Sequence, residues 1–130
     1  MADRDYYNFA AKVDHFTAKV VPEQANIVKQ KIALDLLTGV VMLIRVDTGR
    51  ARGGWQVSLR SPSDRETGRL DKVGTKTIAH GTRTIESVKP WDDIYLNNPV
   101  VYAAVLNDGD EHRTGDHMVE RTLARVGAQH

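Results

Sequence analysis

The feature that most constrains the fold is a long apolar stretch that begins at Pro22. Proline is tolerated in the first turn of a helix, and the adjacent Glu23 complements the positive end of the helix dipole. Apolar side chains then recur at helical spacing, and in the second half they widen the stripe until most sides are apolar. The widened stripe comprises Ile32, Leu34, Leu36, Leu37, Val40, Val41, Leu43 and Ile44. The sequence therefore predicts a long helix that is buried under a sheet or between subunits.

Shorter patterns predict the elements around this helix. They are a helix at 6–20, a strand at 55–59, a helix at 75–88, a strand at 94–96, one or two helical turns at 100–106 and a helix at 115–126. The polar segments 61–74 and 108–116 are expected to be mobile loops with little apolar content to hold them. The expected fold class is α+β, with N-terminal helices, one of them long, packed on a small, mostly antiparallel sheet, and with a C-terminal helix. A length of 130 residues fits one domain spanning 1–130.

Composition excludes several functional classes. The chain has no cysteine, so it forms no disulfide, thiol nucleophile or thiolate metal site. With 18 basic and 17 acidic residues, it has no global field that would attract nucleic acid or an anionic membrane. The N-terminus lacks the pattern of a signal peptide, and the apolar run at 39–44 is too short to span a bilayer, so an intracellular origin is expected.

An alternative function comes from Asp47, Thr48 and Gly49. In aspartic proteases an Asp-Thr-Gly turn supplies one of two carboxylates that share a proton, and one copy per chain would require a dimer, as in retroviral proteases. That chemistry needs an all-β barrel, whereas here a long helix leads directly into the motif. We therefore expect this segment to be the turn that ends the long helix, with Asp47 accepting backbone N–H bonds.

Two other clusters permit binding functions. The acidic and histidine residues within 108–117 are metal-ligand types, but their spacing matches neither a calcium loop nor an HExxH helix, so a solvated loop is expected. Arg45, Arg50, Arg52 and Arg60 lie near Trp55 and could contact phosphate, which leaves a small nucleic-acid-binding module as a further alternative. No phosphate-binding loop of the GxxxxGK[ST] type is present in the sequence.

Three blocks of sequence resemble one family of proteins, the neck and tail-completion proteins of tailed bacteriophages, also called minor tail or head-tail joining components. Residues 21–55 resemble the family's helix that leads into a V-D-T-G-R-x-R stretch ending in Trp; they read VPEQANIVKQKIALDLLTGVVMLIRVDTGRARGGW. Residues 88–109 are similar to its K-P-G-D-x-I-Y-x-x-N-x-x-x-Y-A block; they read VKPWDDIYLNNPVVYAAVLNDG, with Trp91 in place of the usual glycine. His117, Met118 and Val119, leading into Thr122, are similar to its closing G-M-V-x-x-T helix.

The resemblance implies a structural virion protein that is not an enzyme and needs no cofactor or metal. It implies a homo-oligomer, a six- or twelve-fold ring at the head-tail connector, which contacts a head-side connector protein and a tail-terminator or tail-tube protein. Contact with DNA in the lumen would be non-specific at most, no membrane is involved, and the protein would reside in the virion after assembly in the host cytoplasm. The candidate motif and assembly residues are Asp47, Thr48, Gly49, Arg50, Arg52, Trp55, Tyr95, Asn97, Tyr102, Gly109 and Met118.

Two further expectations concern packing. Trp55 opens a strand and Tyr102 sits in an apolar run, so one face of each ring is expected in the core. The long helix has more apolar surface than a small sheet can cover, and such an excess usually marks a subunit interface.

Overall fold

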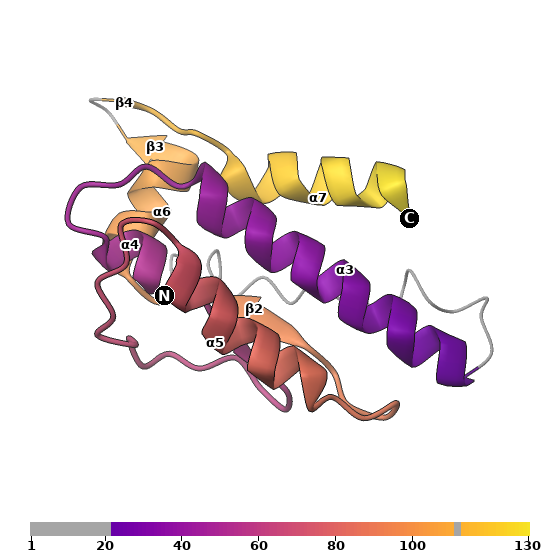
Figure 1. Ribbon diagram of the computed structural model, residues 1–130. Helices are drawn as coiled ribbons and strands as arrows, with labels where there is room; N and C mark the ends of the chain where they lie inside the picture. Colours follow the sequence, from indigo (N-terminus) through magenta and orange to yellow (C-terminus); the bar gives the residue numbers. More distant parts are fainter. Residues whose placement is uncertain (1–21, 111–112) are drawn as a thin grey trace.

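The computed structural model describes residues 22–110 and 113–130, which form an α+β fold around one long helix (Figure 1). The helices are α3 (Pro22–Leu43), α4 (Arg50–Gly53), α5 (Thr75–Glu86), α6 (Val101–Asp108) and α7 (Met118–Gln129). The strands are β1 (Gln56–Ser58), β2 (Tyr95–Asn97), β3 (Gly109–Asp110) and β4 (Arg113–Thr114). The helix expected at 6–20 lies outside the described residues. No helix in the described ranges is long and apolar enough to cross a membrane.

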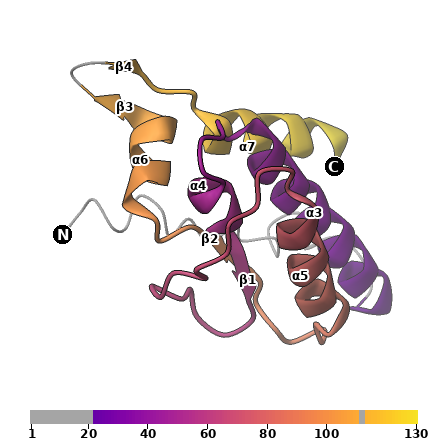
Figure 2. The ribbon, with the colours of Figure 1, turned by 60° about the vertical axis from the view of Figure 1, so that its left-hand side comes forward.

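The long helix α3 runs between α7 and α5 and contacts both (Figures 1 and 2). The apolar residues of its second half are buried, among them Leu36, Val40 and Ile44. Their cover comes mainly from α5 and α7 of the same chain, and Val57 and Leu96 of the small sheet belong to the same core. The inference that the apolar excess of α3 marks a subunit interface is therefore wrong, because the sequence pattern could not show that α5 and α7 pack on opposite sides of α3.

Glycines allow these helices to approach α3 closely. A side chain at Gly81 of α5 would collide with Leu37, and a side chain at Gly39 of α3 would collide with Thr122 of α7. Glycine inside a helix costs about 1 kcal/mol relative to alanine. At Gly81 the glycine carries this cost, and it leaves the space that Leu37 of α3 occupies.

The strands form two small antiparallel pairs. β1 pairs with β2 in the register Gln56↔Asn97, Val57↔Leu96 and Ser58↔Tyr95. The strand predicted at 55–59 is therefore present in shortened form, and the strand predicted at 94–96 is present but begins one residue later. β3 pairs with β4, Gly109 opposite Thr114. The segment 108–116 was expected to be a loop, and this is corrected to the end of α6 followed by the paired strands β3 and β4, with 111–112 outside the described residues.

Candidate functional site

The turn after α3 and the exposed side of α6 frame an open groove of about 430 Å³. The groove is lined by Arg45, Asp47, Thr48, Gly49, Arg50, Ala51, Glu66, Val100, Tyr102 and Val105. The fold thus brings the Asp-Thr-Gly-Arg motif together with residues more than 50 positions later in the chain. An apolar floor surrounded by charged side chains is typical of a binding surface.

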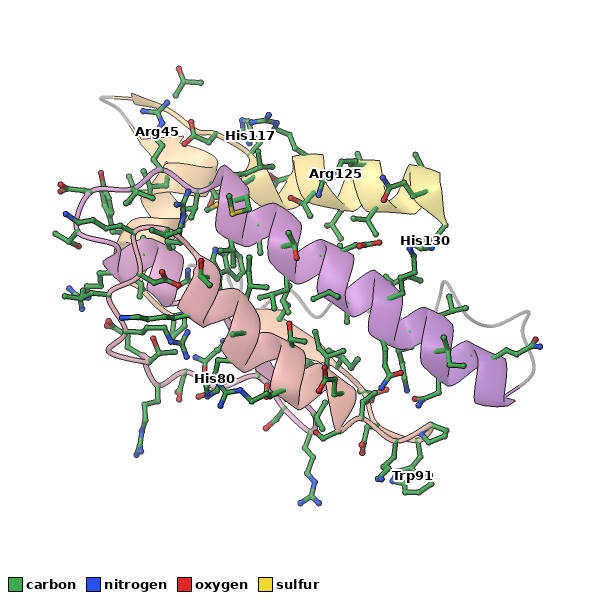
Figure 3. The ribbon with its side chains drawn as sticks, viewed as in Figure 1. Arg45, His80, Trp91, His117, Arg125 and His130 are labelled. Carbon is green, nitrogen blue, oxygen red and sulfur yellow. The ribbon has the colours of Figure 1, made fainter. Side chains whose placement is uncertain are left out.

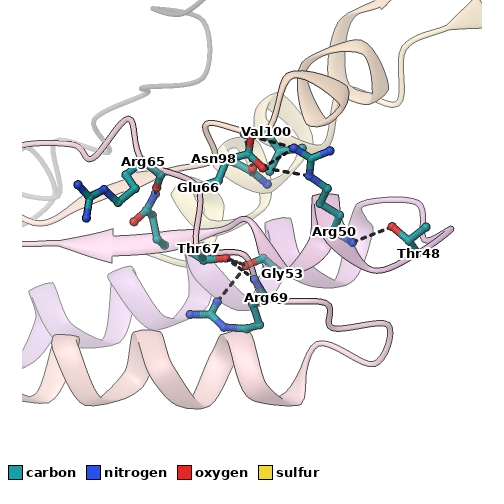
Figure 4. Close-up of polar contacts among 10 residues, drawn as sticks. Thr48, Arg50, Gly53, Arg65, Glu66, Thr67, Arg69, Asn98 and Val100 are labelled. Carbon is teal, nitrogen blue, oxygen red and sulfur yellow. Dashed lines mark hydrogen bonds and ion pairs between the residues drawn. The ribbon is translucent and has the colours of Figure 1, made fainter.

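Two ion pairs involve side chains at the rim of this groove. The Arg50 guanidinium donates to both carboxylate oxygens of Glu66, from Nη2 at 2.7 and 3.0 Å and from Nε at 3.0 Å (Figure 4). Arg45 Nη2 lies 2.8 Å from Asp116 Oδ1. Both arginines are largely exposed, so each pair contributes at most about 1 kcal/mol to stability. Their main effect is to fix the shape of the rim.

The turn itself is closed without Asp47. The side chain of Asp47 is exposed and makes no hydrogen bond or ion pair within the described ranges, so the expected capping role is wrong. Thr48 Oγ1 instead accepts from Arg50 N at 3.2 Å. The carbonyl of Gly49 accepts from Asp71 N at 3.0 Å and from Gly53 N at 2.8 Å. Gly49 has φ +89, a conformation that L side chains rarely adopt, which explains the glycine of this motif.

The carboxylate that does cap a helix is Asp71, which the sequence analysis missed. Asp71 is buried and accepts from Gly74 N at 2.8 Å and from Thr77 N and Oγ1 at 2.7 Å each. Burial by itself would raise the pKa of Asp71, but the bonds from Thr77 and Gly74 and the nearby Lys76 lower that pKa below its ordinary value. Asp71 lies in the segment 61–74, which was expected to be a loop because it is polar throughout.

The two arginines of the R-x-R motif have different surroundings. Arg50 points outward to Glu66, whereas Arg52 donates to the carbonyls of Ile44 at 3.1 Å, Met42 at 3.4 Å and Lys72. Arg52 therefore satisfies carbonyls at the end of α3 and ties them to the 69–74 segment. Its role is structural, and it does not line the groove.

Residues 61–74 are tied to the body by polar contacts. Thr67 Oγ1 and Arg69 Nη1 both donate to the Gly53 carbonyl, at 2.6 and 3.0 Å (Figure 4). Glu66 adds the ion pair with Arg50. The expectation that little holds this loop is therefore wrong, because hydrogen bonds replace the missing apolar contacts.

The remaining candidates divide into buried and exposed residues. Trp55 is only 2% exposed, which confirms its expected place in the core, and Asn97 and Met118 are also buried. Tyr102 is 49% exposed and lines the groove, so the expectation that it packs into the core is wrong. Tyr95 is half-buried in β2. Gly109, with φ +83, ends α6.

Two asparagines join the three blocks of sequence singled out above. Asn98 Nδ2 donates to the Ala51 carbonyl at 2.6 Å, which connects the second block to the first. Asn107 Oδ1 accepts from Val119 N at 3.0 Å, and its carbonyl accepts from His117 N at 2.9 Å, which connects the second block to α7. Asn98 stands at the asparagine position of the K-P-G-D-x-I-Y-x-x-N pattern, whereas no pattern in the sequence singles out the contact of Asn107.

The geometry gives little support to metal binding or to phosphate binding. The described residues contain no group of three or more His, Asp or Glu side chains placed to hold a metal, although 111–112 lie outside them. Of the arginines expected near a phosphate, Arg45 and Arg50 are paired with carboxylates and Arg52 binds carbonyls. Arg60 remains exposed on the surface.

No protein-family model, curated protein or solved structure matches this chain. The resemblance to phage neck and tail-completion proteins therefore rests on the three blocks of sequence alone.

Proposed function

We propose that this protein is a structural component of a tailed-phage neck, part of a ring that completes the tail or joins it to the DNA-filled head. It acts by binding head-side and tail-side proteins, and it catalyses no reaction. The observation that carries this proposal is that three separate blocks of sequence with the family's order and spacing meet in one structural unit.

The contacts between these blocks support the proposal. β1, which follows the first block, pairs with β2 of the second block, and Asn98 reaches back to Ala51. Asn107 of the second block holds the first turn of α7, where the third block begins. The three segments that resemble the family are thus joined by direct contacts, as expected if the resemblance describes a common fold.

The protease alternative fits the geometry less well. It needs Asp47 at the centre of an all-β barrel with a second carboxylate at about 3 Å. Asp47 instead lies on an exposed turn between two helices of an α+β fold. An open groove with an apolar floor and a charged rim favours a protein partner over a small substrate.

Electron microscopy of particles made with and without the protein tests the proposed function. If the protein joins head and tail, its deletion gives separate DNA-filled heads and free tails, and the purified protein restores joining in a mixed extract. The matched control is restoration with an Asp64→Asn variant, which changes an exposed carboxylate outside the groove and should restore joining as well as the wild type does. Normal particles in the deletion strain would refute the neck role.

A further inference from the structure

Charge is unevenly distributed along this nearly neutral chain. Residues 50–85 carry eight basic and three acidic side chains, whereas residues 86–130 carry four basic and eight acidic ones. The chain as a whole has a net charge of only +1. A charge asymmetry of this kind is one signal of a surface that meets a partner of opposite charge.

The acids of the basic segment 50–85 are mostly engaged inside the molecule, whereas its bases are mostly free. Asp71 is buried and caps α5, and Glu66 is bound by Arg50. Asp64 is the one exposed acid of this segment without a hydrogen bond or ion pair in the part of the chain that the structure describes. The exposed basic side chains that also form no such contact are those of Arg60, Arg65, Lys72, Lys76 and Arg83.

Helix α5 gathers part of this charge into a row. Lys76, His80 and Arg83 are exposed and lie four and three residues apart, so they follow one another along a single side of the helix. We call this row the α5 basic face. It is roughly 10 Å long, and His80 projects on the side of α5 that is turned away from α3 (Figure 3). The one acid of α5, Glu86, lines a small pocket between α3 and α5 and therefore faces the other way.

The backbone beneath this face is fixed. Asp71 accepts from the N–H groups of Gly74 and Thr77 in the first turn of α5, and Gly81 packs closely against Leu37 of α3. A rigid support lowers the entropy cost of presenting side chains to a partner. Because the Asp71 carboxylate occupies the start of α5, the contact has to come from the basic side chains and not from the N–H groups of the helix.

The composition of the face favours phosphate over an acidic protein. The exposed positions of α5 carry no large apolar side chain and no Trp, Tyr or Phe, and the exposed Leu70 and Val73 belong to the segment before the helix. The centres of protein interfaces are rich in such residues and poor in charge. Double-stranded DNA, by contrast, carries a negative charge about every 1.7 Å of its axis and is bound non-specifically through Lys and Arg. A row of cations of this length spans several phosphates.

We propose that the α5 basic face, together with Lys72 just before the helix, binds the phosphate backbone of double-stranded DNA. Contacts to phosphates position a protein on the duplex but carry no sequence information, so the binding is independent of sequence. The proposal goes beyond the neck role and does not depend on it. The residues that carry it are separate from the arginines near Trp55, which are mostly paired with carboxylates or bound to carbonyls.

Fluorescence anisotropy of a short labelled duplex tests this proposal on the purified protein. One phosphate contact each for Lys72, Lys76 and Arg83 gives a slope of about −2.7 when the logarithm of the association constant is plotted against that of the salt concentration. Raising the salt from about 50 to 200 mM should therefore weaken binding about 40-fold. An absence of binding at the lower salt concentration, or binding that does not respond to salt, would overturn the proposal.

A pair of matched arginine variants locates the contact. Arg83→Gln should weaken binding roughly 10-fold at about 50 mM salt and reduce the slope to about −1.8, because one phosphate contact is lost. Arg125→Gln removes the same charge from an exposed position of α7, which packs on the opposite side of α3 (Figures 1 and 3). It should change binding by less than about 2-fold, since salt screens distant charges. Thermal melts check that both variants are folded, and equal losses of binding in the two would refute the assignment to α5.

An acidic polypeptide distinguishes DNA from a protein partner. Polyglutamate should displace the labelled duplex much less effectively than unlabelled duplex does at the same concentration of negative charge. Val73→Ser, which changes an apolar side chain that is 71% exposed, should leave DNA binding unchanged because phosphate contacts do not use apolar surface. Equal displacement by polyglutamate, or loss of binding in Val73→Ser, would assign the face to a protein and reject DNA.

This proposal and the neck role can fail separately. If heads and tails stay apart without the protein but Arg83→Gln binds DNA as tightly as the wild type, the neck role stands and the DNA contact is rejected. If the face binds DNA as expected but particles form normally without the protein, the DNA contact stands and the neck role is rejected.

Discussion

At the crossing of α3 and α7, Thr122 is fully buried, and its hydroxyl has no hydrogen-bond partner in the part of the chain that the structure describes. A buried hydroxyl without a partner costs free energy, whereas one that donates to a carboxylate stabilises the fold. The chain holds an example of each, since Thr77 Oγ1 donates to Asp71. Comparing the two threonines separates the effect of the hydroxyl from that of the shape of the side chain.

Thr122→Val should raise the free energy of unfolding by about 1 kcal/mol, because the variant removes an unpaired polar group at nearly constant volume. Thr77→Val should lower it by at least about 1 kcal/mol, because Asp71 loses a donor. Chemical denaturation measures both. A loss of stability in Thr122→Val would mean that its hydroxyl has a partner in solution.

Asp71 should make stability depend on pH in the acid range. Its pKa in the folded protein is below the ordinary value of 3.8, so its contribution is present above the unfolded-state pKa and is lost as pH falls through the lower folded pKa. Asp71→Asn should be less stable than the wild type at pH 7, and the difference should shrink below about pH 4. Asp64→Asn, an exposed control, should change stability by less than about 0.5 kcal/mol at any pH. A constant difference between wild type and Asp71→Asn from pH 7 to pH 3 would contradict this assignment.

Trp55 and Tyr102 should respond differently to truncation. Trp55→Ala should cost about 3 to 5 kcal/mol of unfolding free energy because the ring is buried. Tyr102→Ala should cost less than about 1 kcal/mol, since its ring is 49% exposed. Thermal melts of the two variants distinguish these effects. Equal loss of stability in both would place Tyr102 in the core.

At the scale of elements, the end of α3 depends on one side chain from the following helix. Arg52 of α4 donates to the carbonyls of Met42 and Ile44, which lie at the end of α3, and to Lys72 in the segment before α5. Three elements are therefore joined through one guanidinium, while Arg50, two residues earlier, forms only an exposed ion pair. The spacing of the motif places neighbouring arginines on different sides of a single helical turn.

Arg52→Ala should lower the free energy of unfolding by about 2 kcal/mol, because several carbonyls lose a charged donor. Arg50→Ala is the matched control and should lower it by less than about 1 kcal/mol, as exposed ion pairs contribute little. Melting temperatures of the two variants give the comparison. If the order is reversed, Arg50 and not Arg52 stabilises the turn after α3.

At the scale of the whole molecule, the elements that could be predicted from the sequence are those whose apolar residues recur at a regular spacing. The long helix, the helix at 75–88, the short strands and the last helix are present because their apolar residues repeat at 3.6 or 2 positions. The intramolecular cover of α3, the cap at Asp71 and the bridges made by Asn98 and Asn107 were missed. These depend on contacts between side chains and distant backbone, such as the bond from Asn98 to Ala51, which no local pattern records.

Only the local part of the candidate site could be predicted from the sequence, because the rest depends on contacts between distant residues. The turn at 47–50 could be recognised from its residues, and the groove contains it. The side chains that complete the groove come from α6 and from Glu66, whose positions follow from tertiary packing. Tyr102 was misplaced because an apolar run of 100–106 does not reveal which side of a short helix faces solvent.

The position of α3 between the two ends of the molecule has a geometric consequence. The turn that presents Trp91 is fastened near the start of this helix, and the groove opens just beyond its end. The length of α3, whose 22 residues span roughly 33 Å, therefore sets the distance between this turn and the groove. Inserting one helical turn into α3 would move the groove about 5.4 Å further from this turn, and it would shift one end of α3 past the residues of α5 and α7 that now pack against it.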